Sequence, residues 1–196
     1  MSKNFQLLSI TIALTVLSTA NCRLFEAPAP LKGPVVPAKV HVDLQRYMGT
    51  WYGIASIPLP FGGDCVCGLS KYTLEKGNKV RVYNECQNKA GKKRSVIGFA
   101  VSRNADNTEL SVFIYGNQAP YWILDIGDSQ NYGYVLVGEP SRKSLFILAR
   151  TRTITDAVYK KLTDKAVELG YDPKTLVKSQ PQYCEKASAM DAVAFE

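Results

Sequence analysis

The side chains best suited to covalent chemistry are five cysteines and one histidine, His41. A single histidine cannot build a multi-histidine metal centre, and a Ser/His/Asp or Cys/His pair needs that histidine inside the folded core. His41 follows the proline-containing run 34–39, so we expect it to be solvated just ahead of the domain. These observations argue against an enzyme, and we predict no catalytic residue, no metal site and no cofactor.

One cysteine stands apart from the other four. Cys22 follows an apolar run from Phe5 to Ala20, which is too short to predict a membrane span and has the form of a secretory signal. Five cysteines is an odd number for an exported protein, so we expect Cys22 to be acylated as in bacterial lipoproteins. The remaining four can then form two disulfides: Cys65, Cys67, Cys86 and Cys184.

This interpretation of Cys22 sets the expected domain order. The predicted segments are a signal peptide over 1–21, a proline-rich tether over 22–40, a folded domain over 41–186 and a tail over 187–196. Acyl chains on Cys22 would hold the protein at the bacterial outer membrane, facing the periplasm. The alternative is cleavage after Ala20, which would give a soluble periplasmic or secreted protein.

The folded part has the pattern of β-strands. From Gly49 onward, short apolar runs alternate with polar residues, and turn residues recur at short intervals. We predict eight strands, at 49–57, 66–75, 79–87, 94–102, 109–115, 120–127, 132–138 and 144–150.

A helical period appears only after these strands. Its apolar face carries Val158, Leu162, Ala166 and Leu169. Thr155 is placed to cap the helix, and Gly170 followed by Pro173 to end it. One helix cannot cover a whole sheet, whereas closing the sheet removes its exposed edges. We therefore predict an all-β fold, an eight-stranded antiparallel up-and-down barrel with one C-terminal α-helix packed outside.

The net charge of +7 does not indicate a nucleic-acid partner. Nucleic-acid binding needs basic residues gathered on one face. The densest runs here, Lys92-Lys93-Arg94 and Lys160-Lys161, are short and flanked by turn or helix residues. We expect them to be solvated surface.

Three stretches resemble a known family. Residues 43–52, which contain Gly49-Thr50-Trp51, look like the first signature of the lipocalins. Residues 119–124 are similar to apolipoprotein D, and residues 137–142 with 145–151 resemble the bacterial outer-membrane lipocalins. Because the stretches occur in the family's order, the resemblance covers the whole folded part and implies a barrel that is closed at one end.

The resemblance also implies roles for particular residues. Arg150 should lie over Trp51 at the closed end, next to Gly49, as a cation–π plug. The wall of a ligand cavity should include Tyr72, Val112, Tyr121 and Phe146. Strand alternation adds Ser70, Ile114, Ile123 and Leu148 to this wall, and places Cys65 and Cys67 on the outside. The alternative is a tightly filled core without a void.

A cavity of this kind implies binding of a small hydrophobic molecule, which the protein carries or stores. The bacterial relatives suggest a fatty acid, a lysophospholipid or an oxidised lipid fragment.

Two other classes of function stay open. One is a lipocalin-fold enzyme that acts on a lipid through a cysteine of the second strand, Cys65 or Cys67. The other is an envelope protein-docking module that uses the outside of the barrel. The sequence does not predict the oligomeric state of the protein.

The cysteine pattern resembles that of plant chloroplastic lipocalins, and two pairings are open. A two-residue turn at Lys76-Gly77 would place Cys67 opposite Cys86 and leave Cys65 for Cys184. Alignment with apolipoprotein D instead joins Cys67 to Cys184, and Cys65 to Cys86. We favour the first pairing. In either case each bridge contributes roughly 2–4 kcal/mol.

Overall fold

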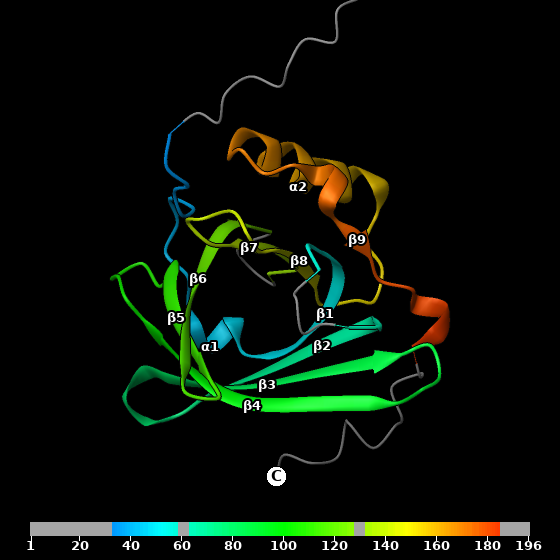
Figure 1. Ribbon diagram of the computed structural model, residues 1–196. Helices are drawn as coiled ribbons and strands as arrows, with labels where there is room; N and C mark the ends of the chain where they lie inside the picture. Colours follow the sequence, from blue (N-terminus) through cyan, green and yellow to red (C-terminus); the bar gives the residue numbers. More distant parts are fainter. Residues whose placement is uncertain (1–32, 59–62, 128–131, 185–196) are drawn as a thin grey trace, which may run out of the picture. The chain divides into compact units, whose positions relative to one another are not determined.

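The structure is a computed structural model that describes residues 33–58, 63–127 and 132–184 (Figure 1). All of these belong to one compact unit, Leu31–Glu196. Cys22, the predicted signal peptide and most of the predicted tether lie outside the described residues.

Eight strands form a closed antiparallel barrel, as predicted. Each strand pairs with the next, and β1 pairs with both β2 and β8. The strands are β1 (Gly49–Ser56), β2 (Cys65–Leu74), β3 (Lys79–Asn88), β4 (Lys93–Ser102), β5 (Glu109–Ile114), β6 (Asn117–Ile126), β7 (Tyr134–Gly138) and β8 (Leu145–Ala149). A short strand that was not predicted, β9 (Val177–Lys178), adds to β1 on the outside of the closed ring.

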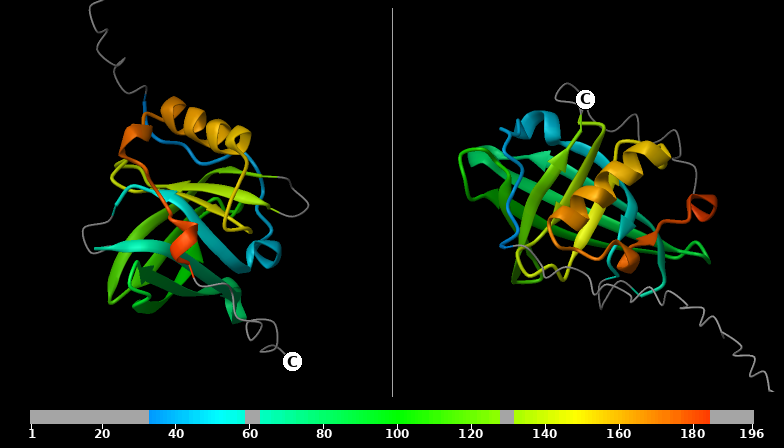
Figure 2. Two further views of the ribbon diagram at one scale, coloured as in Figure 1. Left: turned by 90° about the vertical axis from the view of Figure 1, so that its right-hand side faces the viewer. Right: turned by 90° about the horizontal axis from the view of Figure 1, so that it is seen from above.

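The predicted C-terminal helix is α2 (Asp156–Glu168). The Thr155 side chain accepts a hydrogen bond from the Val158 N–H at its start, and Gly170 follows its end with φ +81°. Leu162 and Ala166 are fully buried against β6, β7, β8 and β1. Figures 1 and 2 show α2 lying across the outside of the barrel, on the side away from β3 and β4. The remaining helical segments are single turns: α1 (Leu44–Tyr47), η1 (Lys76–Asn78), η2 (Pro173–Thr175) and η3 (Pro181–Tyr183).

Strand alternation separates two apolar cores. The inner core lies inside the barrel and includes Trp51, Tyr72 and Ile123. The outer core lies under α2 and includes Leu136, Ile147 and Leu162. Neighbouring residues on one strand contribute to different cores, because successive side chains point to opposite faces.

The described end of the predicted tether packs against the barrel. Val35 is 3% exposed and belongs to the outer core. The Ala38 N–H donates to the Ile123 carbonyl at 2.8 Å. Residues 33–42, which we call the strap, are therefore part of the folded unit and are not a free tether.

The favoured disulfide pairing is wrong, because the turn between β2 and β3 is one residue longer than assumed. Residues 76–78 form the turn, which the Glu75 N–H closes by donating to the Lys79 carbonyl at 2.7 Å. This shifts the register, so Cys86 lies opposite Gly68, and Cys67 lies opposite Gln87.

The observed disulfides are Cys65–Cys86 and Cys67–Cys184, the second pairing considered above. A register shift between Cys65 and Cys67 places Cys65 opposite Asn88, and therefore on the same sheet face as Cys86. Cys67 stays on the outer face, where Cys184 fastens the C-terminal segment to β2. The prediction that both Cys65 and Cys67 face outward holds only for Cys67.

Candidate ligand site in the barrel

One end of the barrel is closed, and we call this end the floor. The three predicted signature residues, Gly49, Trp51 and Arg150, lie there. The Arg150 guanidinium carbon lies 3.7 Å from the centroid of the Trp51 ring, and Trp51 is fully buried. Arg150 Nη1 donates to the Thr50 carbonyl, and Nη2 donates to the carbonyls of Arg46 and Tyr47. Gly49 has φ +93°, and a Cβ there would lie 3.6 Å from Arg150 Nη1. The cation thus joins α1 to β1 below the indole.

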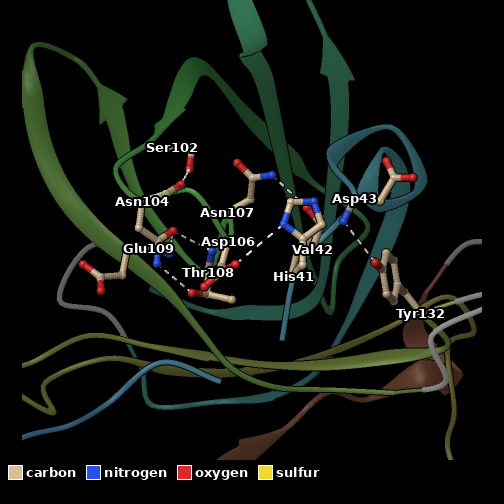
Figure 3. Close-up of polar contacts among 10 residues, drawn as sticks. All are labelled: His41, Val42, Asp43, Ser102, Asn104, Asp106, Asn107, Thr108, Glu109 and Tyr132. Carbon is tan, nitrogen blue, oxygen red and sulfur yellow. Dashed lines mark hydrogen bonds and ion pairs between the residues drawn. The ribbon is translucent and has the colours of Figure 1, made fainter. Parts of the chain in front are cut away.

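The strap reinforces this floor (Figure 3). The Val42 N–H donates to the Asp106 carbonyl, and the Val42 carbonyl accepts from Asn107 Nδ2, both at 2.8 Å. The Asp43 N–H donates to the Tyr132 hydroxyl at 3.1 Å. His41 is exposed and lies 3.7 Å from Asp106, as expected for a solvated residue.

Three tyrosine hydroxyls meet above the floor. The hydroxyl oxygen of Tyr121 lies 2.8 Å from that of Tyr47 and 3.3 Å from that of Tyr72. Tyr47 comes from α1, whereas Tyr72 and Tyr121 come from β2 and β6. Burial raises the pKa of all three phenols above the ordinary value of 10.0, and raises those of Tyr47 and Tyr121 furthest. The group is therefore uncharged at physiological pH.

These shifts predict a loss of stability at alkaline pH. A phenol whose pKa is higher in the folded state holds its proton more tightly there, so its contribution is complete below pH 10 and falls as pH rises above that value. The contribution of the three phenols to the free energy of unfolding should be level from neutral pH up to about pH 10 and decline beyond it. Spectrophotometric titration at 295 nm should show at least three of the 11 tyrosines ionising only as the protein unfolds. Ionisation of all of them near pH 10 in the folded state would contradict the cluster.

The eight predicted wall residues share the inner face of the barrel. Tyr72, Ile123 and Leu148 are buried in the inner core, and Val112, Tyr121 and Phe146 are partly buried against it. Ser70 and Ile114 lie on the same face by register, opposite Trp51 and Gly98 respectively. Both are of intermediate exposure.

The side chains of the inner wall are tightly packed near the floor and become accessible towards the open end of the barrel, which we call the mouth. Near the floor Val82 and Ile123 are at most 2% exposed. Nearer the mouth, Val112, Ile114 and Phe146 keep intermediate exposure although they face inward. A Cβ built on Gly68, which is on the inner face opposite Cys86, meets no atom within 4 Å. Near the mouth, the inner wall is therefore lined with apolar groups that other side chains of the protein do not cover.

Sequence reasoning missed the contribution of β3 to this wall. Val80, Val82 and Asn84 of β3 lie opposite Leu74, Tyr72 and Ser70 of β2. The assumed two-residue turn would have turned Arg81 inward instead. The alternation of valine with polar residues over 80–84 was the signal that identifies the inner positions.

The structure limits the chemistry that the site can do. Cys65 and Cys67 are both in disulfides, so neither offers a thiolate. Within the described ranges, no group of three or more His, Cys, Asp or Glu is placed to hold a metal ion. No helix in the part of the chain that the structure describes is long and apolar enough to cross a membrane.

A closed antiparallel barrel with an apolar inner wall is the architecture of proteins that hold one small ligand. Residues 42–181 match the lipocalin-like domain, and the chain belongs to the lipocalin family. It is similar to temperature-induced lipocalin-1 of Arabidopsis thaliana, with 36% identity over 149 residues, which are 70% of this chain and 78% of the relative.

Other relatives span the groups that the sequence resembles. Apolipoprotein D of Cavia porcellus is 33% identical over 108 residues, covering 53% of this chain and 56% of the relative. Outer membrane lipoprotein Blc of Vibrio cholerae is 25% identical over 142 residues, covering 71% and 83%. Among solved structures, lobster apocrustacyanin A1 shares the fold with a TM-score of 0.57 at 19% identity, covering 74% of this chain and 89% of that one. Two disulfides are typical of an exported protein.

Proposed function

We propose that this lipocalin takes up a small hydrophobic molecule through the open end of the barrel and carries or stores it without chemical change. The observation that carries the proposal is the inner wall near the mouth, where apolar side chains face inward and stay partly exposed, with open space beside Gly68. Long-chain lipids, the fatty acids and lysophospholipids among them, are the ligand class that such a wall favours.

The binding energy of such a ligand comes from its chain. Each buried methylene contributes about 0.8 kcal/mol, so a chain of about ten contributes at most about 8 kcal/mol before ordering costs. Micromolar affinity therefore requires most of the chain inside the barrel. Capture and release are then governed by equilibrium at the mouth, and no bond is made or broken.

Tryptophan fluorescence tests this proposal. Trp51 forms the floor of the inner core, whereas Trp122 packs with the outer core. Titrating delipidated protein with a twelve-carbon lipid should give a saturable change, which persists in Trp122→Phe because Trp51 reports it. No saturable change would favour the docking module over the carrier.

A location at the cell envelope belongs to the same proposal. Acylation of Cys22, with residues 22–32 as spacer, would keep the barrel near an outer membrane. The similarity to an outer membrane lipoprotein supports this location. The intact mass of membrane-extracted protein should show the acyl chains on a chain that begins at Cys22. A mature chain that begins at Asn21 and lacks lipid would instead favour secretion.

A further inference from the structure

Polar side chains interrupt the apolar wall about half-way up the barrel. Ser70 and Asn84 are cross-strand partners on the inner face, and Ser70 is also opposite Trp51. Ser70 is near enough to the Tyr72 hydroxyl to affect the pKa of that phenol. With Tyr47, Tyr72 and Tyr121 these residues form a band of neutral polar groups, which we call the polar belt: Tyr47, Ser70, Tyr72, Asn84 and Tyr121.

One atom of the polar belt lacks a partner. The Oδ1 atom of Asn84 is fully buried, and no donor among the described residues reaches it. A buried amide oxygen without a hydrogen bond is unfavourable, and nearly all such atoms in folded proteins are paired. Asn84 is on the inner face and the residue as a whole keeps intermediate exposure. A small rotation of its side chain would therefore let a molecule within the barrel supply the missing donor.

The same belt also has a donor to offer. Three phenol protons are shared among Tyr47, Tyr72 and Tyr121, and two contacts between hydroxyls, at 2.8 and 3.3 Å, use two of them. One proton is left for Ser70 or for a ligand. A hydroxyl group both donates and accepts, so it can satisfy Asn84 and a phenol together, whereas a carboxylate only accepts.

No cation forms a hydrogen bond with the polar belt among the described residues. The Arg150 guanidinium acts electrostatically on Tyr47, Tyr72 and Tyr121, but it lies against Trp51 and donates to three backbone carbonyls at the floor. Arg94 has an inner-face register position opposite Cys86, but it is near the mouth, exposed and paired with Asp64 at 2.8 Å. A carboxylate at the polar belt would lose its hydration without gaining a hydrogen-bonded counter-ion.

We propose that the polar belt selects long-chain lipids whose buried polar group is an uncharged hydroxyl, with Asn84 Oδ1 accepting its proton. This inference rests on the proposed function and narrows it, because it favours a fatty alcohol or a similar neutral lipid over a free fatty acid. It also sets the orientation, with the hydroxyl end deep and the chain extending past Val112 and Phe146 towards the mouth.

The test compares 1-dodecanol with dodecanoate at pH 8, by Trp51 fluorescence of delipidated full-length protein carrying Trp122→Phe. Dodecanol should bind at least tenfold more tightly. Asn84→Leu, which keeps similar volume without the acceptor, should weaken dodecanol about tenfold and change dodecanoate less than twofold. Val96→Leu is the matched control, since Val96 is the β4 partner of Asn84, and it should affect both probes equally.

Asn84→Asp guards against a folding defect in the leucine variant. The aspartate keeps an acceptor at the same place, so dodecanol should still bind. The affinity for dodecanoate should be lower than in the parent protein, because the two carboxylates repel each other. Equal affinities for the two probes, or equal changes in every variant, would overturn this inference and leave the carrier proposal intact. Binding of neither probe would overturn the carrier proposal and this inference with it.

Discussion

Gly68→Phe should weaken lipid binding by about a hundredfold. The new side chain enters the open space on the inner face, where a Cβ meets no atom within 4 Å. A phenyl ring takes the room of about four methylenes, which at about 0.8 kcal/mol each amounts to about 3 kcal/mol of lost binding. The affinity measured by fluorescence titration should fall accordingly.

The structure of the variant should stay intact. Gly68 does not have a positive φ, so a side chain is compatible with its backbone. The free energy of unfolding should therefore change by less than about 1 kcal/mol. Leu69→Phe is the control, because Leu69 lies on the outer face of the same strand, opposite Tyr52, and it should leave binding unchanged. Undiminished binding by Gly68→Phe would mean that the lipid does not occupy the barrel.

Loss of the Cys67–Cys184 bridge should destabilise the protein more than loss of Cys65–Cys86. The first closes a separation of 117 residues and the second one of 21. Loop-closure entropy assigns them about 5 and about 3 kcal/mol respectively. Paired Cys→Ser variants, compared by denaturant unfolding, should show this order. The loss of about 5 kcal/mol would remove much of the net stability of a domain of this size.

The long bridge also holds the C-terminal segment in place. Gln87 Nε2 donates to the Tyr183 carbonyl at 2.7 Å, and the Gln180 N–H donates to the Val66 carbonyl at 2.9 Å. In Cys67→Ser/Cys184→Ser this segment should become sensitive to proteolysis, whereas in Cys65→Ser/Cys86→Ser it should stay protected. Non-reducing peptide maps that join Cys67 to Cys86 would contradict the observed pairing.

The barrel and its helix could be predicted because their signals are local. Alternating apolar residues mark strands whatever their partners, and Thr155 and Gly170 mark the ends of α2 by their own chemistry. The predicted strand boundaries differ from the observed ones by at most three residues. The largest difference is at β6, which begins at Asn117, directly after the tight turn at Tyr115-Gly116.

The features that could not be predicted depend on register and on distant packing. One added residue in the turn after Leu74 moved Cys86 from opposite Cys67 to opposite Gly68 and changed the disulfides. The strap contains two prolines and four valines, and only its packing in the outer core shows why Val35 is buried whereas Val36 is exposed. The polar belt draws its members from α1, β2, β3 and β6, which no single stretch of sequence brings together.

The most direct test of the central claim is a crystal structure of the protein with a bound twelve-carbon lipid. The account predicts continuous density for an alkyl chain inside the barrel, beside Gly68, Val112 and Phe146, above an undisturbed Trp51–Arg150 floor. An interior filled by the protein's own side chains, with the lipid bound only to the outer surface, would contradict it.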